Sequence, residues 1–183
     1  METWEWIVVG AAAALLVVLV AAFVRIRRRR THLQERFGPE YHRTVSGRGR
    51  SVAEKRLSEV EQRREELDIR PLPAAARERY LDEWRQAEAR FVHDPRDAVR
   101  TAERLVTRVL HDRGYELDGE DDDFDRRVEL VAVDHPDIAE RFRHGHAMLG
   151  RVDGAEATEH LRKAMIDFRA VLDELLEGER VSA

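Results

Sequence analysis

The sequence predicts an all-α protein: a single N-terminal transmembrane helix, a charged juxtamembrane helix and a cytoplasmic bundle of about five helices. Three observations support this fold class. A 19-residue segment near the start carries no charge, the apolar residues after it recur at helical spacing, and no stretch alternates as strands do. Charged residues make up 38% of the 183-residue chain, so the helices after the apolar segment must be amphipathic.

The uncharged segment runs from Trp6 to Val24 and would span roughly 28 Å as a helix, close to the hydrocarbon thickness of a bilayer. Tryptophans at one end suit the membrane interface, and the arginines at the other end resist translocation. We therefore expect a single-pass cell-membrane protein with its N-terminus outside and its C-terminal domain in the cytoplasm. A cleaved signal peptide is disfavoured because no basic residue precedes the apolar segment. The anchoring residues are Trp4, Trp6, Arg25, Arg27, Arg28, Arg29 and Arg30.

Small residues share one face of the predicted anchor. Gly10, Ala14 and Ala21 would let two such helices approach closely and form a weak homodimer. The alternative, which we favour, is that alanine is simply common in this chain.

Charge divides the chain into zones. Residues 1–30 form the anchor with its basic end, 31–70 a basic juxtamembrane collar and spacer helix, 71–178 the bundle domain and 179–183 a tail. Residues 25–70 hold 14 basic against 8 acidic groups, whereas residues 71–183 hold 18 against 27. A basic collar fits a bilayer with anionic headgroups, on which Phe37 and Tyr41 would rest. Glu35, Glu40 and the acidic body argue against nucleic acid as the partner.

The cytoplasmic helices can be placed from capping signals and apolar spacing. Ser51 and Glu54 resemble a capping box that opens a helix to about residue 68, whose thin apolar stripe suggests a solvated spacer. Pro71 and Pro73 then break the chain. Proline follows a capping residue at Asp94 and again at Asp134-His135. The bundle helices are expected at about 74–92, 95–113, 124–133, 136–149 and 158–177.

Several segments together resemble a family of uncharacterised bacterial proteins that are short, helical and anchored in or adjacent to a membrane. The resemblance covers about residues 31–176 and implies no activity, substrate or catalytic residue. The segments that carry it are LQERFGPEY followed by RTV, LDIRPLP, ERYLDEW with RFV and DP, RLVTRVL with RGY, and VDHPDI.

No catalytic, cofactor-binding or metal-binding motif can be assigned. The chain has no cysteine, which excludes thiolate metal sites and cysteine nucleophiles. His144 and His146 are two positions apart and so lie on different faces of a helix. Seven acids between residues 116 and 125 do not follow the spacing of a calcium loop. Within them, Asp121, Asp122 and Asp123 are candidate contacts for a basic partner, although a solvated loop is the simpler interpretation.

The function that these features favour is a membrane-tethered interaction or scaffolding module with an unknown protein partner. The alternative is a small-ligand sensor or enzyme whose site lies inside the helical bundle.

Overall fold

The computed structural model describes residues 3–115, 124–150 and 156–177; the side chains of residues 3–15, 29, 30 and 48 are not part of this description. Within these ranges the chain forms eight α-helices and no strand, which confirms the all-α class and the helical bundle. The helices are α1 (Thr3–Phe37), α2 (Pro39–Arg48), α3 (Arg50–Glu66), α4 (Ala74–Phe91), α5 (Pro95–Asp112), α6 (Phe124–Asp134), α7 (Pro136–Leu149) and α8 (Ala157–Glu177).

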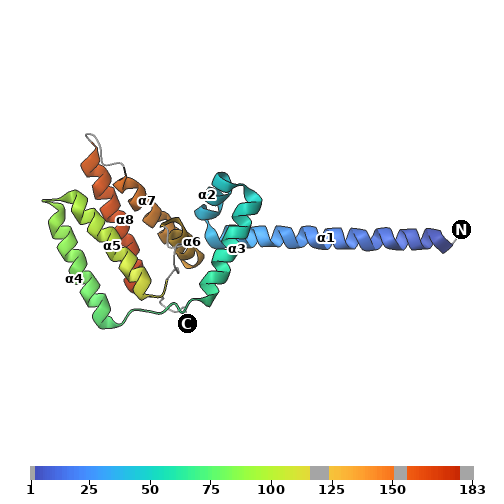
Figure 1. Cartoon of the computed structure of the whole chain (residues 1–183), viewed down its shortest axis with the longest axis horizontal. Coiled ribbons are helices and arrows are strands. Elements are labelled where there is room, and N and C mark those ends of the chain that lie inside the picture. The colour runs from blue at the N-terminus through green and yellow to red at the C-terminus, as the bar shows by residue number, and fades with distance from the viewer. Residues whose placement is uncertain (1–2, 116–123, 151–155, 178–183) are drawn as a thin grey trace.

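Helix α1 projects from the rest of the molecule as a long arm (Figure 1). Its 35 residues correspond to roughly 52 Å of helix. The last turns of α1 are not part of the projecting arm, because Leu33 and Phe37 are buried in the hydrophobic core. Tyr41 on α2 is buried as well, and its hydroxyl donates to Glu54 over 3.1 Å. The prediction that Phe37 and Tyr41 rest on lipid headgroups is therefore wrong.

Helix α1 contains the whole predicted span, but the structure describes only part of its side chains. Among the side chains that the structure describes, which in α1 begin at Leu16, no helix is long and apolar enough to cross a membrane. Residues 6–15 of the predicted span lie outside those side chains. The apolar residues from Leu16 to Val24 are exposed. The membrane anchor stays a prediction.

Helix α3 is docked on the bundle instead of forming the expected solvated spacer. Ala53, Leu57 and Val60 are buried and α3 packs against α6. The expected capping box is not used, because α3 already begins at Arg50 after Gly49, whose φ of 79° ends α2 and starts α3. The apolar stripe of α3 is thin because part of its contact with the bundle is polar: arginines of α3 form ion pairs with carboxylates of α6.

The remaining helices match the sequence-based boundaries closely. Helices α4 and α5 form an antiparallel hairpin, and α5 and α7 pack on α8 (Figure 1). The Asp94 cap of α5 is confirmed, since its carboxylate accepts from the backbone N–H of Asp97 over 3.0 Å. At the start of α7, His135 occupies the capping position, but its side chain forms no capping hydrogen bond. One hydrophobic cluster runs from Leu33 to Leu176 and thus includes residues on both sides of Pro71.

The closest approach between α7 and α8 depends on Gly145. A Cβ at this position would lie 2.9 Å from Cε1 and 3.2 Å from Cδ1 of Phe168. The ring of Phe168 is fully buried and cannot move aside without disturbing its neighbours.

Replacing Gly145 by alanine should therefore destabilise the fold, even though alanine is the better helix former by about 1 kcal/mol. Overpacking costs about 1–3 kcal/mol, so after the helix-propensity gain we expect a net loss of up to about 2 kcal/mol in denaturant unfolding followed by circular dichroism. Gly47→Ala in α2 is the matched control, because no atom lies within 4 Å of its Cβ position. Equal stability of the two variants would mean that α7 and α8 are not packed as described.

Candidate functional site

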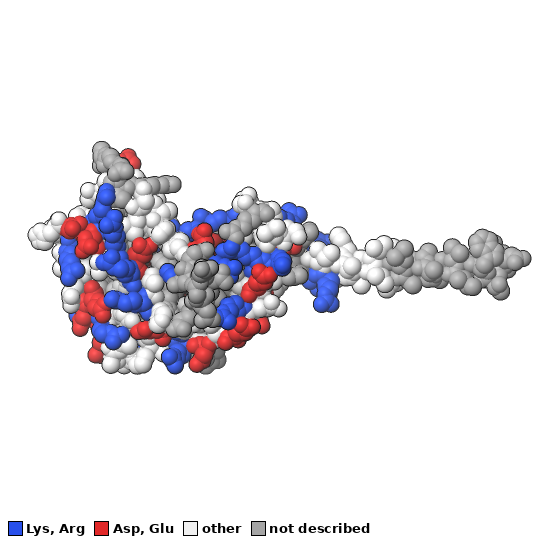
Figure 2. Space-filling model, viewed as in Figure 1, with Lys and Arg blue, Asp and Glu red and all other residues white. Residues whose placement is uncertain are grey.

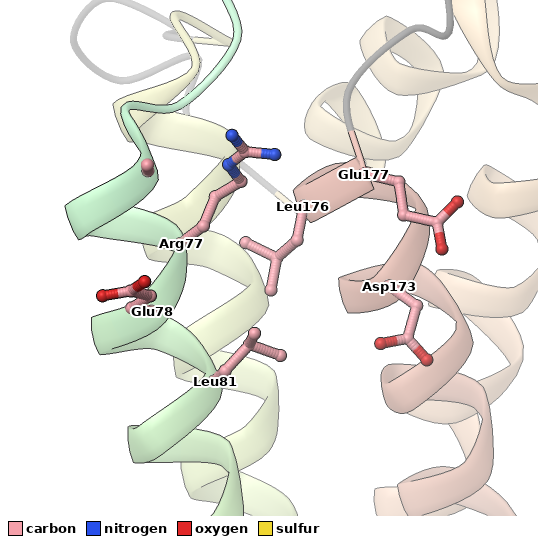
Figure 3. Close-up of a pocket in the computed structure, with 7 residues that line it drawn as sticks. Arg77, Glu78, Leu81, Asp173, Leu176 and Glu177 are labelled. Atoms are coloured by element: carbon pink, nitrogen blue, oxygen red, sulfur yellow. The ribbon is translucent and has the colours of Figure 1, made fainter.

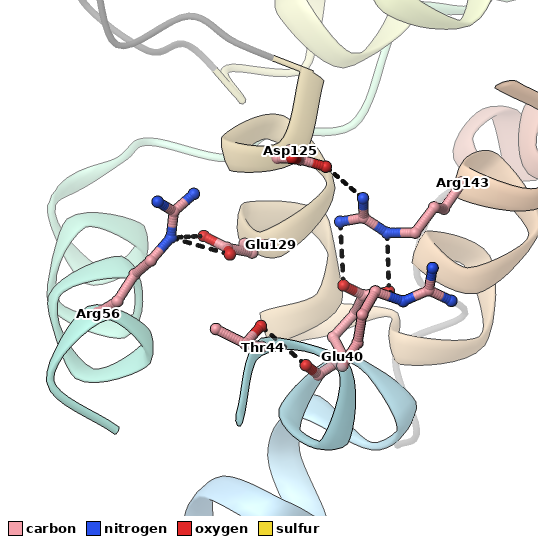
Figure 4. A network of polar contacts seen from close by, with 7 residues as sticks. Glu40, Thr44, Arg56, Asp125, Glu129 and Arg143 are labelled. Atoms are coloured by element: carbon pink, nitrogen blue, oxygen red, sulfur yellow. Dashed lines mark hydrogen bonds and ion pairs between the residues drawn. The ribbon is translucent and has the colours of Figure 1, made fainter. Parts of the chain in front are cut away.

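Three arginine–carboxylate pairs join the first helices to the bundle, and we call them together the clasp. The pair between Glu40 on α2 and Arg143 on α7 is bidentate, with Nε to Oε1 and Nη2 to Oε2 both 3.0 Å (Figure 4). The Glu40 side chain is 1% exposed and that of Arg143 14%. Arg143 also pairs with Asp125 of α6, and the Thr44 hydroxyl donates to the Glu40 backbone oxygen over 2.9 Å.

The other two pairs of the clasp connect α3 with α6. Nε of Arg56 donates to both carboxylate oxygens of Glu129, over 2.9 and 2.6 Å, and both side chains are largely buried (Figure 4). Arg64 pairs with Asp134. The sequence suggested that Asp134 helps to cap α7. In the structure its carboxylate is instead engaged by Arg64 and by the Tyr115 hydroxyl, which donates over 2.8 Å.

The clasp determines where the first helices dock more than it adds stability. A buried ion pair gains little relative to apolar side chains, because both charges lose their hydration. Removing one partner is costly, since the other charge is left buried. If α2 and α3 docked on the bundle in any other register, the arginines and carboxylates of the clasp would no longer lie within hydrogen-bond distance. The planar guanidinium suits this role because its donors match the two oxygens of a carboxylate.

An open groove lies between α4 and α8, with a volume of about 390 Å³. Leu81 and Leu176 point toward one another across it (Figure 3). Its charged residues are Arg77 and three carboxylates, of which Asp173 pairs with Arg169 over 2.8 Å. The groove contains no nucleophile–base pair and suits contact with an apolar and cationic segment better than catalysis. The carboxylates are those of Glu78, Asp173 and Glu177.

Two histidines of α7 pair with carboxylates of other helices. His144 contacts Asp167 of α8 over 2.5 Å. His146 pairs with Glu103 of α5 and stacks on Phe124 at 3.8 Å between ring centroids. Within residues 3–115, 124–150 and 156–177, no group of three or more His, Asp or Glu side chains is placed to hold a metal ion.

The residues predicted to anchor the chain are described only in part. Arg25, Arg27 and Arg28 are exposed where α1 leaves the bundle, and Figure 2 shows basic side chains at that point. Arg27 and Arg28 line a shallow surface hollow together with Phe23 and His32. Ala21 is exposed. The side chains of Trp4, Trp6, Gly10, Ala14, Arg29 and Arg30, and the whole of Asp121, Asp122 and Asp123, lie outside the described residues.

Sequence reasoning did not find the clasp. Glu129 gave a usable signal, because it is a lone charge within the apolar run from Val128 to Val133. Such a charge on a buried helical face needs a partner. Nothing local identified that partner as Arg56, which is 73 positions away.

The chain matches no protein-family model, no curated protein and no solved structure. Its function is therefore inferred from its own geometry.

Replacing Arg143 by methionine should destabilise the protein by about 3 kcal/mol, because the Glu40 carboxylate would stay buried without its main partner. Arg43, 3.4 Å from Glu40, would compensate only partly because its side chain is half exposed. The double variant Glu40→Gln/Arg143→Met should recover part of the loss. Arg108→Met is the control: Arg108 forms an exposed pair with Glu83, worth about 1 kcal/mol or less. Equal losses in denaturant unfolding for Arg143→Met and Arg108→Met would contradict a buried clasp.

Proposed function

We propose that this chain is a single-pass protein of the cell membrane that holds a helical interaction module at a fixed distance and orientation on the cytoplasmic side. The observation that carries the proposal is the continuity of α1. One helix contains both the apolar segment and the buried Leu33 and Phe37.

A continuous helix couples the module to the bilayer without a flexible linker. Between Arg25, at the end of the predicted span, and Leu33, in the core, the chain has neither glycine nor proline. Eight helical residues correspond to roughly 12 Å, so the module would lie directly against the headgroup region. Glycine- and serine-rich linkers, in contrast, leave a domain free to reorient.

The charge distribution supports this orientation. The exposed arginines at the base of α1 would meet anionic headgroups and keep this side in the cytoplasm. The end of the bundle farthest from α1 carries α4, which lines the α4–α8 groove (Figure 1). A protein partner with basic and apolar side chains would complement that groove. A homodimer through Gly10, Ala14 and Ala21 stays a subsidiary prediction.

A second candidate function, small-ligand sensing, is favoured by one specific observation. The buried guanidinium of Arg113 has no carboxylate partner among the described residues.

The membrane topology can be tested with reporters. A reporter that is active only in the cytoplasm should be active when fused after Ala183, because the arginines at residues 25–30 resist translocation. Neutral residues in place of Arg25 and Arg27 to Arg30 should produce mixed orientations. A C-terminal reporter that is active only outside the membrane would overturn the proposal.

Fixed orientation can be tested with single cysteines, since the chain has none. Fluorophores would be placed by Lys55→Cys on α3, next to α1, and by Glu88→Cys on α4, at the far end (Figure 1). A headgroup-bound quencher should quench the α3 label strongly and the α4 label weakly. Six flexible residues inserted between Arg30 and Thr31 should reduce this difference. Equal quenching at both positions in the parent protein would show that the module reorients freely.

A further inference from the structure

Arg113, the first residue after α5, is a buried cation that has no counter-ion among the described residues. The residue is 4% exposed. Nη1 donates to the backbone oxygen of Leu175 over 3.2 Å, whereas Nε is buried without a hydrogen-bond partner. Buried charges in proteins are normally paired, because an unpaired one loses its hydration without compensation. No carboxylate of the described residues forms an ion pair with Arg113.

Arg113 lines a recessed pocket of about 160 Å³ where α3, α5 and α6 end. Three guanidinium groups face one carboxylate there. Arg64 is already paired with Asp134, and no carboxylate of the described residues forms an ion pair with Arg70 or Arg113. This excess of positive charge stands out in a chain with a net charge of −5. The pocket is lined by Arg64, Ile69, Arg70, Pro71, Arg113, Tyr115, Asp134 and His135.

The backbone holds Arg70 beside Arg113. The Arg70 N–H donates to the Arg113 oxygen over 2.9 Å. Gly114 has a φ of 97°, and a Cβ there would lie 2.4 Å from the Asp68 oxygen. Glycine therefore lets the segment before Pro71 press against the end of α5, which fixes one wall of the pocket.

Among the described residues that line the pocket, the one carboxylate is occupied by donors. Asp134 accepts from Arg64 and from the Tyr115 hydroxyl. Burial, together with the charge of Asp134, raises the pKa of Tyr115, so the phenol remains a neutral donor at physiological pH. An incoming anion would thus meet a carboxylate whose charge is already offset.

Helix capping explains only part of this arrangement. Arg113 donates to Leu175 near the end of α8, and the negative ends of α5 and α8 offset some of its charge, about half a unit for each helix end. Capping satisfies Nη1 but leaves Nε unpaired, and it does not explain the charge of Arg70.

We propose that this pocket binds a small oxyanion, the phosphate or carboxylate group of a soluble ligand, through Arg70 and Arg113. Its volume is several times the ~30 Å³ of one water molecule, yet below the ~300 Å³ of sites that enclose whole drug-sized ligands. The pocket therefore fits the anionic group of a ligand. Guanidinium groups bind phosphate and carboxylate oxygens with two parallel hydrogen bonds. This site extends beyond the proposed tethering function.

The test uses the full chain in a neutral detergent, with inorganic phosphate as the probe and chloride at matched ionic strength as the reference. Phosphate should bind with one-site stoichiometry in calorimetry and raise the melting temperature saturably. Arg70→Gln should melt like the parent without phosphate, since Arg70 is exposed, but bind phosphate roughly tenfold or more weakly. Arg113→Gln should also lose the rise in melting temperature that phosphate produces. Arg100→Gln, on an exposed position of α5, is the control and should bind like the parent.

Equal responses of the parent, Arg70→Gln and Arg100→Gln would indicate general screening and overturn the proposal, as would no binding at all. Vesicles of phosphatidic acid, compared with neutral vesicles, test the other source of phosphate. Stabilisation by the acidic lipid without any effect of free phosphate would assign the pocket to headgroups and contradict a soluble ligand. Phosphate binding that appears only after Asp121, Asp122 and Asp123 are changed to asparagine would identify the chain's own acids as the occupant and also contradict it.

Discussion

The buried carboxylate of Glu40 is the constraint on which the architecture depends. It follows α1 almost immediately in the chain, and its charge is tolerated inside the protein chiefly because Arg143 of α7 supplies two hydrogen bonds. This pair fixes α2 against α7, and Arg56 and Arg64 fix α3 against α6 in the same way. Since α1 shares its last turns with this core, the direction in which α1 leaves the molecule is set by the same contacts.

This arrangement changes where the boundary of the folded core lies along the chain. A basic collar suggests a segment that lies on lipid and connects two independent parts. The structure instead places most apolar side chains of residues 33–60 in one core with the bundle, and pairs the largely buried Arg56 with Glu129 of α6. In a module built in this way, packed helices connect α1 to α4 and α8 without a flexible linker. That property would suit a tether whose partner must be met at a defined height above the bilayer.

Local chemistry was sufficient to place most of the bundle. The Asp94 cap, the proline at the start of α5 and the apolar stripe of α8 are properties of neighbouring residues, and the predicted helices match those observed. Docking of the first helices was not predictable in this way. The partners in the clasp are separated by 103, 73 and 70 positions, so local periodicity cannot pair them. The Arg113 pocket was missed for a related reason, because three segments that are distant in the sequence build it and abundant arginine conceals which side chains are buried.

The central claim is that the end of α1, together with α2 and α3, belongs to the folded core and is not a linker. Amide hydrogen exchange of the full chain tests it directly, because exchange reports the free energy of local opening. The amides of Phe37, Leu57 and Val60 should exchange as slowly as those of Leu105 and Leu172 in α5 and α8. Rapid exchange of residues 33–60, with slow exchange confined to α4–α8, would contradict the account and restore the picture of a solvated spacer.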